Sequence, residues 1–166
     1  MRVLLLFMLM VMAFPALAEE KIPDAYRTTG YALPRFASLA SEKVYVRAGP
    51  GMKYPVLWVF EQEGYPVEIT LEFDHWRKIK DHEGQEGWVH SSLLSGKRSA
   101  FVTGDADLPL KAAAGEGAAV SVMLKPGVIA TIERCEGEYC RLKTSGYRGW
   151  AQRKSFWGVY PGENID

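Results

Sequence analysis

The side chains that most readily carry chemistry here are two cysteines, three histidines and twenty carboxylates, in a chain of 166 residues. A nucleophilic cysteine needs an activating neighbour, and a zinc site needs ligands at recurring short spacings. The histidines stand at 75, 82 and 90, apart from Cys135 and Cys140, and their spacing matches no zinc pattern. The sequence therefore predicts no catalytic cysteine, no metal site and no cofactor.

Motifs for enzyme chemistry are missing from the sequence. Gly-x-Ser-x-Gly, His-Glu-x-x-His and the phosphate-binding loop do not occur. A pair of carboxylates can hydrolyse sugar linkages, so a hydrolase remains a third interpretation. Twenty basic residues balance the twenty acidic ones, which disfavours nucleic acid as a partner. The chain is predicted to be non-catalytic.

The two cysteines are predicted to form a disulfide across a hairpin. Strand-like residues flank Gly137-Glu138, and glycine at the first position of a two-residue turn suits type II′. Counting outward from this turn, Cys135 faces Cys140 in a non-hydrogen-bonded pair, where side chains approach closely. Closing so short a loop adds about 2 kcal/mol of stability.

Residues 1–18 have the pattern of a cleaved signal peptide. Arg2 precedes an unbroken apolar run from Val3 to Phe14, and Ala16-Leu17-Ala18 offers a cleavage site. The run is shorter than the ~20 residues that span a bilayer, which favours cleavage over the alternative of a retained anchor. The predicted location is the periplasm or the medium, with no membrane span after cleavage. Two cysteines in an oxidising compartment pair by default.

These side chains must be positioned by short strands, because no segment has a long helical period of apolar residues. Residues 19–35 are polar and contain prolines, which is typical of a flexible lead-in. In residues 67–73, apolar and polar side chains alternate, which predicts a half-buried strand with one wet face. The fold class is therefore predicted as all-β.

The second half of the chain repeats the first at an almost constant offset. Gly87-Trp88 recurs as Gly149-Trp150, and Ile69 recurs as Ile132. The predicted copies are residues 36–97 and 98–160, followed by a tail at 161–166. In this alignment, Glu72 and Arg77 occupy the places of the two cysteines. They would form a cross-strand ion pair, worth well under ~1 kcal/mol if exposed.

The first copy opens with Tyr45-Val46-Arg47, a Gly49-Pro50 turn and then Tyr54. Further on it contains Trp76-Arg77-Lys78-Ile79 and Gly87-Trp88-Val89-His90. In this order the segments resemble a bacterial SH3 domain. The resemblance implies two tandem small SH3-like β-barrels, of a kind that often serves as a cell-wall or peptide-binding module beside hydrolases.

Five residues of the first copy are the candidate ligand-binding set, because aromatic faces suit extended ligands and arginine can orient a carboxylate. They are Tyr45, Arg47, Tyr54, Trp58 and Trp76. Each has a structural alternative: the aromatic residues can pack against the partner copy, and Arg47 can pair with Glu61 or Glu63. Trp88 and Trp150 match in both copies, which favours packing over ligand contact.

The second copy has lost part of this chemistry, since an alanine-rich stretch at 112–119 replaces the Gly-Pro turn and its aromatic residues. Only the first copy is expected to bind, with the second as support. The predicted function is a non-catalytic exported module that binds peptidoglycan or an extended peptide in the cell envelope. The alternative is a protein-interaction module that docks an envelope enzyme. The sequence assigns no role to residues 157–162.

Overall fold

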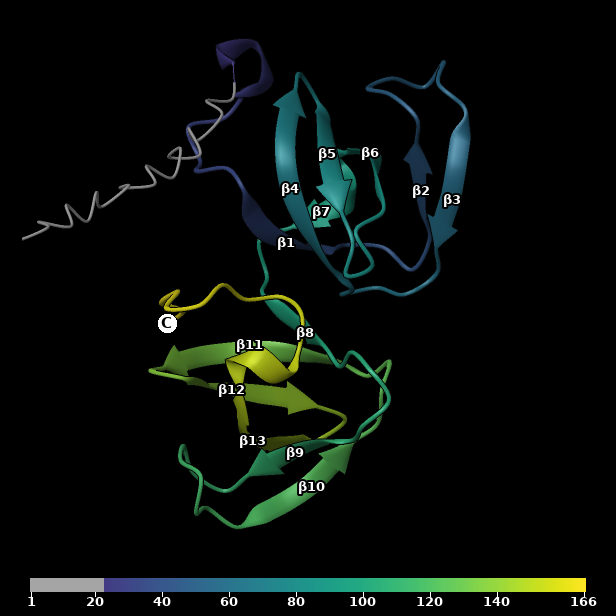
Figure 1. Cartoon of the computed structure of the whole chain (residues 1–166). Helices are drawn as coiled ribbons and strands as arrows, with labels where there is room; N and C mark the ends of the chain where they lie inside the picture. The colour runs from purple at the N-terminus through teal and green to yellow at the C-terminus, as the bar shows by residue number, and fades with distance from the viewer. Residues whose placement is uncertain (1–22) are drawn as a thin grey trace, which may run out of the picture.

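The computed structural model describes residues 23–166, which fold into short antiparallel strands and single turns of 3-10 helix (Figure 1). The first domain comprises η1 (Asp24–Tyr26), β1 (Arg35–Leu39), β2 (Val44–Arg47), β3 (Val56–Phe60), β4 (Pro66–Phe73), β5 (Trp76–Lys80), β6 (Glu86–His90), η2 (Ser91–Leu93) and β7 (Leu94–Ser95). The second comprises β8 (Ser99–Phe101), β9 (Leu108–Lys111), β10 (Val120–Leu124), β11 (Ile129–Glu136), β12 (Tyr139–Thr144), β13 (Tyr147–Gln152) and η3 (Arg153–Ser155).

Each domain is one bent sheet around its own core. The strand order is β3-β2-β6-β5-β4-β1-β7 in the first domain and β10-β9-β13-β12-β11-β8 in the second. Within the described part of the chain, the edge strands of each sheet are not hydrogen-bonded to each other, so neither sheet closes into a complete barrel. The prediction of an all-β chain with two SH3-like units is confirmed.

The same strand pairing occurs at equivalent positions of the two sheets. Ile69 lies opposite Ile79 in the first domain, and Ile132 lies opposite Leu142 in the second. All four side chains are buried in their cores. In β4 and in β11 the register shifts directly after this pair, so the irregularity is repeated along with the regular pairing.

The register shift in β4 overturns the predicted wet face. Val67 and Ile69 are buried as predicted, but Glu72 is 0% exposed and Phe73 is 43% exposed. The shift lies between Ile69 and Leu71. An extra residue in one strand moves every following side chain to the opposite face of the sheet. The simple alternation therefore fails beyond Ile69, and a carboxylate is carried inward.

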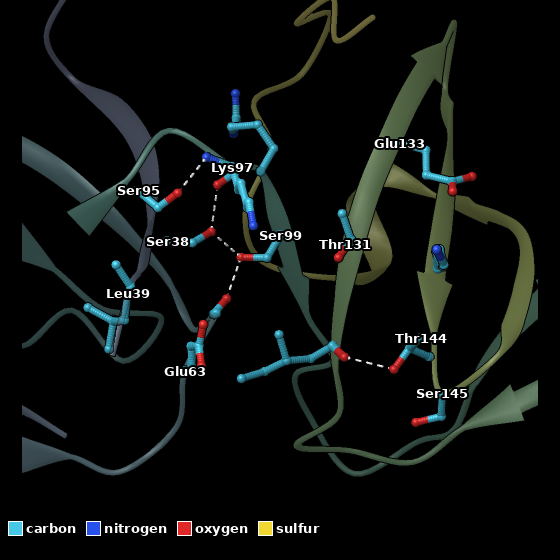
Figure 2. A pocket seen from close by; sticks show the side chains of 15 residues that line it. Ser38, Leu39, Glu63, Ser95, Lys97, Ser99, Thr131, Glu133, Thr144 and Ser145 are labelled. Atoms are coloured by element: carbon cyan, nitrogen blue, oxygen red, sulfur yellow. Dashed lines mark hydrogen bonds between the residues drawn. The ribbon is translucent and has the colours of Figure 1, made fainter. Parts of the chain in front are cut away.

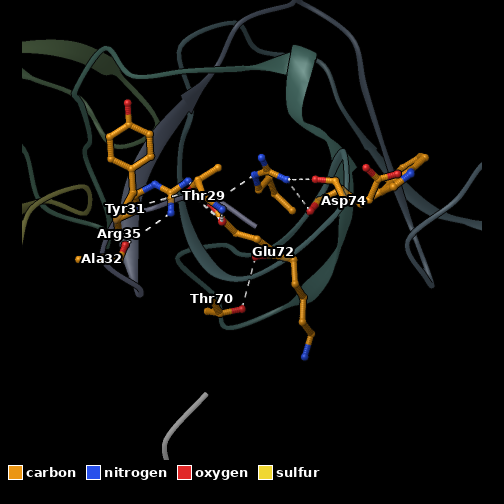
Figure 3. Close-up of polar contacts among 10 residues, drawn as sticks. Thr29, Tyr31, Ala32, Arg35, Thr70, Glu72 and Asp74 are labelled. Carbon is orange, nitrogen blue, oxygen red and sulfur yellow. Dashed lines mark hydrogen bonds and ion pairs between the residues drawn. The ribbon is translucent and has the colours of Figure 1, made fainter. Parts of the chain in front are cut away.

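Glu72 is the centre of a buried ion cluster (Figure 3). Its Oε1 lies 2.5 Å from Arg35 Nη2 and 3.4 Å from Arg77 Nε. The backbone N–H of Thr29 donates to Oε2 at 2.6 Å, and the Thr29 hydroxyl donates to Oε1 at 2.8 Å. Burial raises the pKa of Glu72, but the hydrogen bonds from Arg35 and Thr29 outweigh it and hold that pKa below the ordinary value.

The Glu72–Arg77 pair stands where the second domain has its disulfide. Arg77 is 8% exposed, so the pair is buried rather than a weak surface contact. Cys135 and Cys140 face each other with Cα atoms 4.0 Å apart and are bonded. Gly137 has a φ of +52°, as the first position of a type II′ turn requires. The same inward position is thus joined by charge in one domain and covalently in the other.

The segment before β1 contacts the first domain. Residues 1–22, which include the predicted signal peptide, lie outside the described residues. Leu33 packs against the first core, and Thr29 is bonded to Glu72 on β4. These contacts tie the described part of the predicted flexible lead-in to the sheet.

Residues 157–165 complete the second domain. Trp157 and Phe101 exchange backbone hydrogen bonds of 2.8 and 2.9 Å, so Trp157 pairs with β8 as β7 pairs with β1. Glu163 pairs with Arg98, and the carbonyl of Ile165 accepts a hydrogen bond from the backbone N–H of Cys135 at 2.9 Å. Burial raises the pKa of Glu163, but the hydrogen bonds from Arg98 and from the Tyr160 backbone N–H, together with the charges of Arg98 and Arg153, outweigh it and lower that pKa.

Aromatic side chains join the two domains at two places. The Phe36 ring lies 4.9 Å from Trp157 and 4.7 Å from Tyr160, between ring centroids. The Phe101 ring lies 4.9 Å from that of Tyr65, and Phe101 also packs against the first core.

Hydrogen bonds accompany this aromatic contact. The Tyr160 hydroxyl donates to Glu68 Oε1 at 2.7 Å, and Glu68, which the sequence places on a wet face, is only 6% exposed. Burial, followed by this bond to Glu68, raises the pKa of Tyr160. Burial likewise raises the pKa of Tyr65, whose hydroxyl lies 2.5 Å from His82 Nδ1.

Candidate binding surface

The strands β2, β6 and β5 are neighbours, and their side chains away from the core form one surface, here called the outer face. Val46, Val89 and Ile79 point into the first core. Because side chains alternate along a strand, the residues beside them on the same strands point outward. The outer face comprises Tyr45, Arg47, Trp76, Lys78, Lys80, Glu86, Trp88 and His90, and Glu86 pairs there with Lys78.

Three of the five predicted site residues lie on the outer face. Tyr45 is 44% exposed and has the ammonium of Lys43 5.4 Å from its ring centroid. Trp76 is 8% exposed and meets the His90 ring edge-on at 5.5 Å. Arg47 lies opposite Trp88 across β2 and β6. The surface therefore combines aromatic edges with cationic groups.

Arg47 has a structural task as well. Its Nη1 donates to the carbonyl of Tyr54 at 2.9 Å and to that of Met52 at 3.3 Å, which holds the loop after β2 in place. Lys111 does the same in the second domain, where its Nζ donates to the carbonyls of Gly115 and Glu116. Among the described residues, neither Glu61 nor Glu63 forms an ion pair with Arg47.

Tyr54 and Trp58 are not brought to the same surface patch. The Tyr54 ring covers Gly49, where an added Cβ would come within 2.6 Å of the ring. Trp58 faces the opposite side of β3, because it packs against the first core and lies opposite the buried Val46. Neither residue is among those that join the two domains. Tyr54 therefore shapes the loop, and Trp58 supports the outer face from within.

Trp88 is the residue of this surface that the sequence reasoning set aside as packing. It is 8% exposed, yet it points away from the core that holds its neighbour Val89. The glycine before it has a separate purpose, since a Cβ at Gly87 would lie 2.4 Å from Val46 Cγ1. The Gly-Trp pair thus brings β6 close to β2 and places an indole on the far side. The recurrence of the Gly-Trp pair in both copies was the sequence feature from which this surface tryptophan could have been identified.

The second domain retains an aromatic groove at the equivalent place. A cavity of about 310 Å³ is lined there by Pro109, Lys111, Tyr139 and Trp150, among others. The Arg134 guanidinium stands 5.2 Å from the Trp150 ring centroid. The expectation that only the first copy keeps such a surface is therefore wrong. It was drawn from the loop at 112–119, whereas the groove is built mainly by residues of β9, β12 and β13, with Glu116 as the contribution of that loop.

Two further observations concern the described residues. They contain no group of three or more His, Cys, Asp or Glu side chains arranged to hold a metal ion. From Pro23 onward, no helix has the length and apolar character needed to cross a membrane.

Comparison with known proteins agrees with the repeat. The family model described as "Bacterial SH3 domain" matches residues 40–96 and again 105–158. The protein provisionally named N-acetylmuramoyl-L-alanine amidase YrvJ, from Bacillus subtilis (strain 168), is 26% identical over 125 residues. That alignment covers 69% of this chain but only 24% of the relative, so the chain spans about a quarter of the relative's length.

Two solved structures from Trichomonas vaginalis, of NlpC2 and NlpC1, are each 12% identical in sequence to this chain. The matches cover 82% and 86% of this chain and 52% and 51% of the other two, each at a TM-score of 0.35. A score this low does not establish a common arrangement of the whole chain.

Proposed function

This chain belongs to the bacterial SH3 domain family, and from that premise we propose that it is a non-catalytic module that binds peptidoglycan or an extended peptide in the cell envelope. Its similarity to a protein provisionally named as an N-acetylmuramoyl-L-alanine amidase supports the envelope setting, because muramic acid is a peptidoglycan sugar. The signal-peptide pattern of residues 1–18 and the disulfide support an exported, oxidising location.

One observation carries the proposal: the outer face gathers Tyr45, Trp76 and Arg47 on one surface, away from the contacts that join the domains. Aromatic faces contribute contact area against sugar rings and extended backbones, and the cations there suit carboxylates. Such a small open surface predicts micromolar or weaker affinity.

Pull-down on purified cell-wall sacculi tests the proposal. We expect the wild-type protein to be retained and Tyr45→Ala to lower the retained fraction about 3- to 10-fold, because the exposed ring is the accessible part of the outer face. Tyr147→Ala is the matched control, since Tyr147 is a 56%-exposed tyrosine on β13. Failure of the wild-type protein to bind sacculi, or equal losses in the two variants, would contradict wall binding through this surface.

Docking of an envelope enzyme is the second candidate, and exposed apolar side chains at an edge strand favour it. β3 ends the first sheet, and Val56 and Leu57 on it are 41% and 51% exposed. An unpaired strand edge is a template for a partner's strand. Cross-linking in cells from a photoreactive residue at position 57 should then recover one dominant protein.

A further inference from the structure

A cleft of about 740 Å³ lies between the two domains (Figure 2). Its walls include Ser38, Glu63 and Ser95 from the first domain, Lys97 from the connection between them, and Thr131 and Lys143 from the second. A volume of this size is typical of sites for small ligands, and such sites are frequent where domains meet. Hydroxyl and charged groups line the cleft together with Leu39, Ala40 and Ile129, so its wall is mixed, with polar and apolar parts.

Hydrogen bonds between the domains fix the base of the cleft. The Ser99 hydroxyl oxygen lies 2.5 Å from the carbonyl oxygen of Gly64 and 2.5 Å from the Ser38 hydroxyl oxygen, and its single proton goes to one of these two acceptors. Ser38 in turn donates to the carbonyl of Lys97 at 2.7 Å. Ser38 and Ser99 are 3% and 6% exposed. The base is therefore formed without a ligand, which lowers the conformational cost of binding.

The second sheet presents a row of polar side chains to the cleft. Ser99 lies opposite Thr131 across β8 and β11, and Thr131 lies opposite Lys143 across β11 and β12. Residues paired in this way point to the same side of a sheet. The row runs from the base, at Ser99, to the rim, where Lys143 is exposed.

The charges of the cleft are incompletely paired. Arg98 is joined to Glu163, and Glu133 is joined to both Arg141 and Arg148. Within residues 23–166, Lys97, Lys143 and Glu63 take part in no ion pair. The cleft therefore offers two ammonium groups and one carboxylate to a ligand.

We propose that the interdomain cleft is a second binding site, for a small ligand that combines a carboxylate with several hydroxyl or amide groups, as a sugar–peptide fragment does. Lys97 and Lys143 bind the carboxylate through charge-assisted hydrogen bonds. Thr131 and Ser95 exchange hydrogen bonds with hydroxyl and amide groups, and Glu63 accepts from an N–H of the ligand. The site is separate from the outer face and does not require wall binding by it.

Muramyl dipeptide is the probe, because it carries sugar hydroxyls, amides and one free carboxylate. Its addition to the isotope-labelled full chain should shift the amide signals of Thr131 and Lys143, and calorimetry should give a dissociation constant. Amidation of its carboxylate should weaken binding at least 10-fold. Lys97→Gln and Lys143→Gln should each weaken binding about 5-fold or more. Lys125→Gln should leave it unchanged, because that lysine is 77% exposed and outside the cleft.

Three outcomes would overturn the proposal. They are an absence of shifts around the cleft, equal binding of the dipeptide and its amide, and shifts with inorganic phosphate that match those with the dipeptide. Shifts confined to Tyr45 and Trp76 would refute the cleft and support the outer face. Conversely, loss of sacculus binding in Tyr45→Ala with intact cleft shifts would leave the cleft site standing, so the two proposals fail separately.

Discussion

Replacing Glu72 by glutamine is expected to destabilise the protein by about 3 kcal/mol, the low end of the range for removing one partner from a buried ion pair. Glu72 is fully buried, and the variant would leave the guanidinium groups of Arg35 and Arg77 facing a neutral amide. Urea unfolding followed by tryptophan fluorescence measures the loss.

Glu86→Gln is the control for that measurement. Glu86 pairs with Lys78, but its side chain is 41% exposed, so losing its charge should cost below ~1 kcal/mol. Similar losses of unfolding free energy in Glu72→Gln and Glu86→Gln would show that the buried ion pairs of Glu72 contribute no more than an exposed pair.

The effect of Glu72 should also depend on pH in one direction. Its folded-state pKa is below the ordinary value of 4.5, because hydrogen bonds from Arg35 and Thr29 outweigh the effect of burial. A lowered folded pKa gives stability that is fully present above the unfolded value and is lost as pH falls through the folded one. The difference between wild type and Glu72→Gln should therefore narrow below about pH 4.5. A difference that stays constant into acid would assign the loss to packing.

Replacing Gly158 by alanine is expected to cost about 3 kcal/mol or more, since overpacking and backbone strain each cost about 1–3 kcal/mol. An added Cβ would lie 2.0 Å from the carbonyl oxygen of Ser99, and the backbone there has a φ of +126°. The obstructing atom is backbone, so a side-chain rotation cannot relieve the clash. Thermal or urea unfolding gives the size of the effect.

Gly96→Ala supplies the comparison, because no atom lies within 4 Å of a Cβ built there. It should leave stability unchanged or raise it slightly. The Gly158 variant should in addition disturb Trp157 and Tyr160, which lie on either side of it in the chain and both contact Phe36, and this would appear as a changed tryptophan emission. Equal stability of both variants would mean that the backbone at residue 158 can move away from the Ser99 carbonyl at no cost, which would contradict the prediction.

The sequence was sufficient for features that depend on local pattern. Turn residues and aromatic positions recur at matching places in the two copies. This made it possible to predict the tandem repeat, the all-β fold class and the pairing of Cys135 with Cys140. The Gly-Trp pairs were recognised as part of the repeat, but the close approach of strands at Gly87 and Gly149 is known only from the structure. Their outward orientation was missed, since burial alone does not tell which face of a sheet a tryptophan occupies.

The remaining features depend on register and on contacts between distant segments. The shift after Ile69 moved Glu72 inward, and no local pattern indicates where a strand gains a residue. The hydrogen bonds of Arg47 to its own loop compete with the assigned ligand role. Phe36 and Trp157 come together only through the docking of two domains, a relation that neither copy encodes by itself.

The aromatic contact at Phe36 has a consequence for the order of folding. The first sheet consists of residues 35–95, so it can form before residues 157–160 dock on it. In that interval the ring of Phe36 has neither Trp157 nor Tyr160 beside it. A partly folded chain, with its second domain not yet docked, thus exposes an aromatic group, and such exposed apolar surface favours aggregation.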